Sequence, residues 1–143
     1  MSLRIRLPFL TYHEAMFGRR ASLDPRLEAA LIYSDRYART KLGEAQPAIL
    51  EMLAPGERLH AIAVDIENVL GVLVVTDQRL MSFVSRELRH DVPRASITGG
   101  RIRRLSSCSY AVTLDPGFGL NVPSQDGADA LLTAIVNRRP ASP

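Results

Sequence analysis

Seven short runs rich in apolar and β-branched residues follow one another between residues 59 and 122, with only a few polar residues between them. The runs have the length of strands, and the segments between them carry turn formers, as in Asp115-Pro116-Gly117. Connections this short join neighbouring strands that run in opposite directions, so the pattern predicts an antiparallel meander. The predicted strands are Leu59–Val64, Val69–Thr76, Leu80–Val84, Leu88–Val92, Ser96–Leu105, Tyr110–Leu114 and Phe118–Val122.

A single amphipathic helix is predicted after the last strand. Ser124 is a candidate N-cap, and Pro140 would stop the helix. Apolar residues recur at helical spacing between them, at Ala128, Leu131, Leu132, Ile135 and Val136. A helix with one apolar face, placed after seven strands, would plug the open end of a bent sheet.

The apolar pattern has a different period before the turn at Ala54-Pro55-Gly56. Leu3–Leu7 alternates like an extended arm, and the rest of this part has helical spacing and capping residues. The predicted helices run from Thr11 to Gly18, from an N-cap at Asp24 to a closing Gly43, and from Pro47 to Leu53. The chain is therefore expected to comprise an arm with helices over 1–53, a strand-rich domain over 54–139 and a tail over 140–143.

Composition excludes several classes of protein. The length of 143 residues suits one globular domain, and a single cysteine excludes an internal disulfide framework and a multi-thiolate metal site. The longest apolar run, Val69–Val75, is far shorter than the roughly 20 residues of a membrane-spanning helix. Leu7–Leu10 is too short for the apolar region of a secretory signal. We therefore expect a cytoplasmic protein.

Catalytic patterns are sparse. His13, His60 and His90 do not have the spacing of metal ligands, and Cys108 has no nearby residue that could accept its proton. The glycine pairs lie among strands and turns rather than before a helix, so no phosphate-binding loop is predicted. The expectation is a protein that is not an enzyme and needs no cofactor or metal.

Two local motifs resemble the bacterial pleckstrin-homology-like (PH-like) domains. They are Pro55-Gly56-Glu57 and the run from Gly71 to Leu80, which contains Thr76-Asp77-Gln78-Arg79. The resemblance covers about residues 54–139. It implies an α+β fold in which a bent, antiparallel, seven-stranded barrel or sandwich is capped by a C-terminal helix, here with a helical N-terminal extension.

The resemblance also implies a binding or assembly module without catalytic activity. Phosphoinositide-binding members hold phosphates with basic residues in the first hairpin loop. Here that loop, Asp65-Ile66-Glu67-Asn68, is net negative, so that lipid site is absent.

The basic residues fall into two segments. The net charge is only +3, but 17 of the 18 basic residues are arginine, and they concentrate near the N-terminus and between residues 79 and 104. Arg101 and Arg103 flank Ile102 in a strand, so both arginines should point outward. Together with Arg86 and Arg89 they could form a basic patch that faces an acidic partner. Alternatively, they form a solvated face that is partly paired with Glu87 and Asp91.

The N-terminal arm combines apolar anchors with arginines, a composition typical of protein interfaces. The candidate anchors are Leu3, Ile5, Leu7, Phe9 and Phe17. The alternative is that Phe9 and Phe17 pack onto the strand-rich domain as ordinary core residues.

Two functions lead, and a third, an enzyme without a recognisable motif, would need a deep pocket lined by titratable groups. The preferred one is a PH-like module that acts through protein–protein contacts, with a homo-oligomer among the options. The alternative is a peripheral membrane protein that binds anionic lipid through its arginine-rich segments. Nucleic acid is disfavoured, because aromatic residues make up only 6% of the chain and none is interleaved with the mid-chain arginines.

Overall fold

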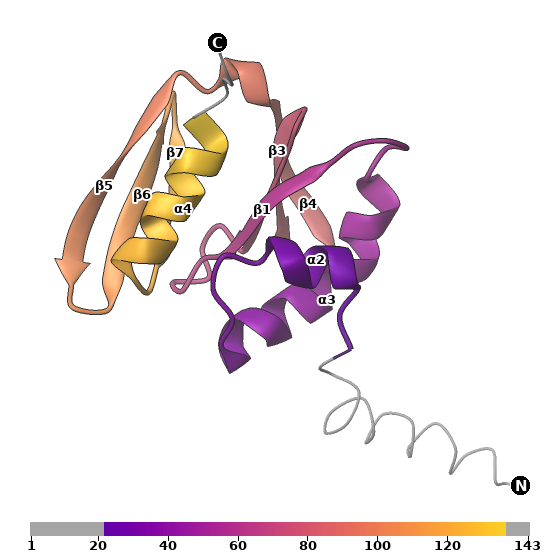
Figure 1. The fold of residues 1–143 in the computed structure, drawn as a ribbon, viewed down its shortest axis with the longest axis horizontal. Helices are drawn as coiled ribbons and strands as arrows, with labels where there is room; N and C mark the ends of the chain where they lie inside the picture. Colours follow the sequence, from indigo (N-terminus) through magenta and orange to yellow (C-terminus); the bar gives the residue numbers. More distant parts are fainter. Residues whose placement is uncertain (1–21, 137–143) are drawn as a thin grey trace, which may run out of the picture.

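The structure, a computed structural model, describes residues 22–136 and has an α+β architecture with two antiparallel sheets (Figure 1). The helices are α2 (Pro25–Ala30), α3 (Arg36–Met52) and α4 (Gln125–Val136), with a short 3₁₀ turn η2 (Arg94–Ser96). The strands are β1 (Leu59–Val64), β2 (Val72–Thr76), β3 (Arg79–Val84), β4 (Glu87–Pro93), β5 (Gly99–Ser106), β6 (Ser109–Asp115) and β7 (Phe118–Val122).

The strands follow chain order within each sheet. The first sheet has the order β1-β2-β3-β4, the second has β5-β6-β7, and every neighbouring pair is antiparallel. The predicted meander and the α+β class are therefore confirmed for the described residues. The two sheets stay separate, so the strands do not form a closed barrel.

Three strands of the four-stranded sheet, β1–β3, are largely buried on both faces, whereas the edge strand β4 is mostly exposed. On one face Val74 and Phe83 pack in a cluster with Leu42 of α3, and on the other Leu73 and Leu80 pack in a second cluster with residues of α4 and the three-stranded sheet. A strand that is buried on both faces requires apolar residues at consecutive positions. The unbroken run Val72–Val75 meets this requirement, because all four residues are buried.

Residues 22–53 pack as part of this unit. The cluster beneath α2 and α3 joins residues from both sides of the predicted boundary at residue 53. Asp24 caps α2 as expected, since its carboxylate accepts the backbone N–H of Arg26 at 2.8 Å. Predictions for the arm and for the helix from Thr11 to Gly18 lie outside the described residues.

The predicted helix from Asp24 to Gly43 is wrong. The chain leaves α2 at Ala30, and Asp35 caps a new helix by accepting the backbone N–H of Ala38 at 2.8 Å. Helix α3 then continues through Gly43 and Pro47, the two residues at which breaks were expected. Its buried face holds it against the sheet, and this packing outweighs the local helix-breaking tendencies.

The residues that suggested PH-like kinship form a buried polar network where α3 meets the strands. The Glu57 carboxylate accepts hydrogen bonds from Arg79 Nε and Nη2, both at 2.9 Å, and from Thr76 Oγ1 at 2.7 Å. It also accepts the backbone N–H of Ala54 at 2.9 Å. These residues fix the β2–β3 turn to the end of α3, which is a structural role.

The Glu57 network makes stability depend on acid pH. Hydrogen bonds from the Arg79 side chain lower the pKa of Glu57 from 4.5 to about 2. A carboxyl group with a lowered pKa in the folded state stabilises the fold above pH 4.5 and loses that contribution as the pH falls towards 2. By about pH 3 this group alone should cost the wild type about 2 kcal/mol of unfolding free energy. When urea unfolding is measured at about pH 6 and at about pH 3, the free energy of unfolding should therefore fall less for Glu57→Gln than for the wild type. Equal falls in the two proteins would contradict a lowered pKa of Glu57 in the folded state.

Helix α4 is fixed at both ends. Ser124 caps its start as predicted, because its hydroxyl accepts the backbone N–H of Gly127 at 3.0 Å. At the other end the buried guanidinium of Arg94 donates to the carbonyls of Ala134 and Ile135. In the sequence, Arg94 is only one of several arginines between residues 79 and 104. It joins α4 to the β4–β5 connection.

Candidate binding surface

The outer face of the three-stranded sheet is not covered by any helix of the described residues. Helix α4 packs on the inner face, against Val112 and Leu120 (Figure 1). Strand register sets two rows of residues on the outer face. One row holds Arg101, Thr113 and Gly119, and the other holds Arg103, Ala111 and Asn121.

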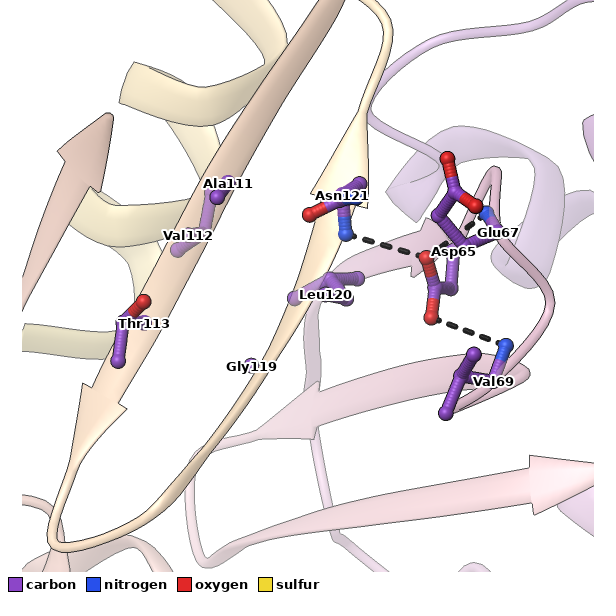
Figure 2. Close-up of a pocket in the computed structure, with 9 residues that line it drawn as sticks. All are labelled: Asp65, Glu67, Val69, Ala111, Val112, Thr113, Gly119, Leu120 and Asn121. Atoms are coloured by element: carbon purple, nitrogen blue, oxygen red, sulfur yellow. Dashed lines mark hydrogen bonds between the residues drawn. The ribbon is translucent and has the colours of Figure 1, made fainter. Parts of the chain in front are cut away.

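An open hollow of about 250 Å³ lies between this outer face and the loop that joins β1 to β2 (Figure 2). The small residues Ala111 and Gly119 line it on the sheet side, and Glu67 and Val69 line it on the loop side. Gly119 has a structural reason to lack a side chain, because a Cβ there would come within 2.4 Å of the carbonyl oxygen of Val112. Because β6 and β7 pair closely at this point, residue 119 carries no side chain, and the surface is recessed there.

The buried side chain of Asp65 holds the loop in place. Its carboxylate accepts backbone N–H groups from Glu67 at 3.0 Å, Val69 at 3.2 Å and Leu70 at 2.8 Å. It also accepts the N–H of Asn121 on β7 at 3.1 Å, so the loop is tied to the second sheet (Figure 2). With four donors on its oxygens, Asp65 acts as a loop anchor. The sequence alone indicated only that this loop is negatively charged.

The loop presents an apolar side chain to solvent. Val69 is 81% exposed, although the hydrogen bond of its own backbone to Asp65 fixes its position. Leu105, on β5, is 46% exposed. These are two of the three large apolar side chains that the described residues leave exposed, and both belong to elements that border the outer face.

The predicted arginines fall into two pairs in different sheets. Arg101 and Arg103 are exposed on β5 and Ile102 is turned towards the core, as their alternation predicted. Arg101 Nη1 lies 3.5 Å from Asp115 Oδ1, whereas Arg103 forms no ion pair with any residue between 22 and 136. Arg86 lies in the β3–β4 turn and Arg89 on β4.

The proposed charge pairing with Glu87 and Asp91 is present in part. Arg89 Nη1 lies 3.4 Å from Glu87 Oε1. Asp91 instead pairs with Arg79, at 3.0 Å. The five apolar anchors proposed for the arm, Leu3, Ile5, Leu7, Phe9 and Phe17, lie outside the described residues.

The histidines of the described segment have structural partners. His90 Nδ1 lies 2.7 Å from Ser82 Oγ, a spacing that a nucleophile and its base would also show, but Ser82 is fully buried and out of reach of a substrate. The His90 ring stacks on Phe118, with ring centroids 5.4 Å apart. His60 contacts the guanidinium of Arg94, and burial and that positive charge lower the pKa of His60.

Residues 22–136 contain no group of three His, Cys, Asp or Glu side chains that could hold a metal ion. Cys108 is exposed in the β5–β6 turn as a free thiol. Within this same segment, none of the helices combines the length and hydropathy needed to span a membrane.

Comparison with known proteins gives no match for this chain, whether by family models, curated proteins or solved structures. The case for a function therefore rests on the fold and on the outer face of the three-stranded sheet.

Proposed function

We propose that this chain is a non-catalytic, PH-like binding module that acts through protein–protein contacts. One observation carries the proposal. Strands β1–β3 are largely covered on both faces and the three-stranded sheet is covered on its inner face, whereas the outer face of the three-stranded sheet is open and hollowed. The order of seven antiparallel strands followed by a helix supports the PH-like kinship, and a cytoplasmic location suits the single cysteine.

The composition of the outer face favours a protein partner. Protein interfaces combine apolar anchors with arginine, and this face has Val69 and Leu105 at its borders with Arg101 and Arg103 beside the hollow. The hollow has no large side chain on its floor, so a partner's side chain can enter it. The anchors proposed for the N-terminal arm would make a second contact.

Filling the hollow should abolish binding. Ala111→Arg puts a long side chain on its floor, and Ala130→Arg, at an exposed position of α4, is the matched control. Each variant and the wild type would be used as bait in host lysate, with retained proteins quantified by mass spectrometry. We expect the retained partner to fall about tenfold or more with Ala111→Arg, which corresponds to at least about 1.4 kcal/mol, and to be unchanged with Ala130→Arg.

Equal retention by the two variants would show that this face is not the binding site, provided that both melt like the wild type. The membrane alternative is tested with vesicles of phosphatidylglycerol and phosphatidylcholine. Binding that weakens steeply with salt, falls with Arg101→Glu and Arg103→Glu and is indifferent to Ala111→Arg would favour lipid over protein.

A further inference from the structure

We infer that the partner of the outer face is a second copy of this chain, an inference that rests on the proposed function. The two sides of the face carry opposite charge. Arg101 and Arg103 stand on β5, and Glu67 stands across the hollow in the β1–β2 loop. A surface with positive charge on one side and negative charge on the other can complement itself.

Strand register places these groups along one line across the sheet. Arg103 pairs in register with Ala111, and Ala111 with Asn121. The backbone of Asn121 donates to Asp65 at 3.1 Å, so the line continues into the loop that carries Glu67. The arginine and the carboxylate therefore lie at opposite ends of one row, with Ala111 and Asn121 between them.

A two-fold axis that runs parallel to the strands, between two facing sheets, exchanges the two ends of this row. Each Glu67 then faces Arg103 of the second copy, and both contacts form at once because a two-fold interface is isologous. Facing sheets pack about 10 Å apart, and Ala111 and Gly119 place no bulky side chain between them. The same exchange carries the exposed Val69 towards the β5 side, where Leu105 is exposed.

Arg103 and Glu67 have the properties that this arrangement requires. Both are exposed, and neither forms an ion pair with another residue between 22 and 136, so no residue of that segment already neutralises the charges that a second copy would meet. Arg101 already has a carboxylate nearby, since its Nη1 lies 3.5 Å from Asp115 Oδ1. Arg101 should therefore contribute less than Arg103 to the contact with a second copy. Exposed charge pairs are screened by salt, so a dimer of this kind should weaken as salt rises.

A charge exchange tests the arrangement in full-length protein by sedimentation velocity over a range of concentrations. The wild type should form a dimer. Glu67→Arg and Arg103→Glu should each raise the dissociation constant about tenfold or more, because one substitution places like charges at both symmetry-related contacts. Mixing the two variants should restore a dimer, since each then meets the opposite charge. Arg86→Glu, with the same charge change in the other sheet, should dimerise like the wild type.

Three results would overturn the inference: a wild type that stays monomeric at every concentration, a dimer that neither reversal weakens, or variants that remain monomeric when mixed although each melts like the wild type. Failure of the dimer can be told apart from failure of the proposed protein-binding function. A monomeric wild type whose lysate partner is lost only with Ala111→Arg keeps the face as a protein-binding site and assigns it to a different protein.

Discussion

Replacing Arg79 with leucine should lower the free energy of unfolding by about 3–5 kcal/mol, the usual range when one partner of a buried ion pair is removed. The Glu57 side chain is completely shielded from solvent, and Arg79 gives it two hydrogen bonds of 2.9 Å. Arg79 also donates to the carbonyl of Met52 at the end of α3, at 2.6 Å. The substitution leaves a buried carboxylate without its counter-charge.

Urea denaturation at neutral pH measures this effect. Arg89→Leu is the matched control, because its ion pair with Glu87 is largely exposed and should contribute less than about 1 kcal/mol. The double variant Glu57→Met/Arg79→Met should be more stable than Arg79→Leu, since it leaves no unpaired charge buried at residue 57. Similar losses for Arg79→Leu and Arg89→Leu would contradict a dominant role for this network.

Replacing Gly71 with alanine should cost about 3 kcal/mol or more, because the new Cβ has nowhere to go. Gly71 has φ of +88° and precedes β2, and a Cβ there would lie 2.1 Å from the carbonyl oxygen of Phe83. Phe83 belongs to β3, whose backbone pairs with β2, so relief of the clash requires the strands to separate.

Gly56→Ala is the control that carries backbone strain without a steric clash. The difference between the two variants therefore measures the steric part of the cost at residue 71. Gly56 also has a positive φ, +83°, but apart from Gly56 itself and its two chain neighbours no heavy atom lies within 4 Å of the position that its Cβ would take. It should therefore lose only about 1 kcal/mol, the strain of a left-handed backbone for a residue with a side chain. Thermal melts of the two variants in the same buffer make the comparison. Equal shifts in Tm would show that backbone strain, rather than the contact with Phe83, sets the cost at residue 71.

The sequence predicted the strands better than the helices, for a physical reason. Leu59–Val64 and Phe118–Val122 were predicted residue for residue, because short turns and β-branched runs are local signals. Gly43 and Pro47 are also local signals, yet α3 passes through both. The packing of that helix on the sheet joins residues far apart in the chain, and no local pattern reports it.

The same division holds for the candidate surface. The outward direction of Arg101 and Arg103 followed from strand alternation alone. The hollow did not, because it depends on Asp65 reaching the backbone of Asn121, a residue 56 positions away. The sequence signal for such an anchor is an acidic residue that directly follows a buried strand, and it has this meaning only once the neighbouring strand is known.

The burial on both faces of strands β1–β3 of the four-stranded sheet has a consequence for how this protein can evolve. The residues that hold the fold together lie mostly between α3, that sheet and α4, whereas the outer positions of β5, β6 and β7 contribute little to either hydrophobic cluster. Substitutions at outer positions such as Arg103 and Ala111 should therefore cost little folding stability, whereas Gly119 is excepted because a Cβ there would lie 2.4 Å from the carbonyl oxygen of Val112. Under the proposed function, a lineage can exchange one partner for another on that face while the scaffold behind it stays the same.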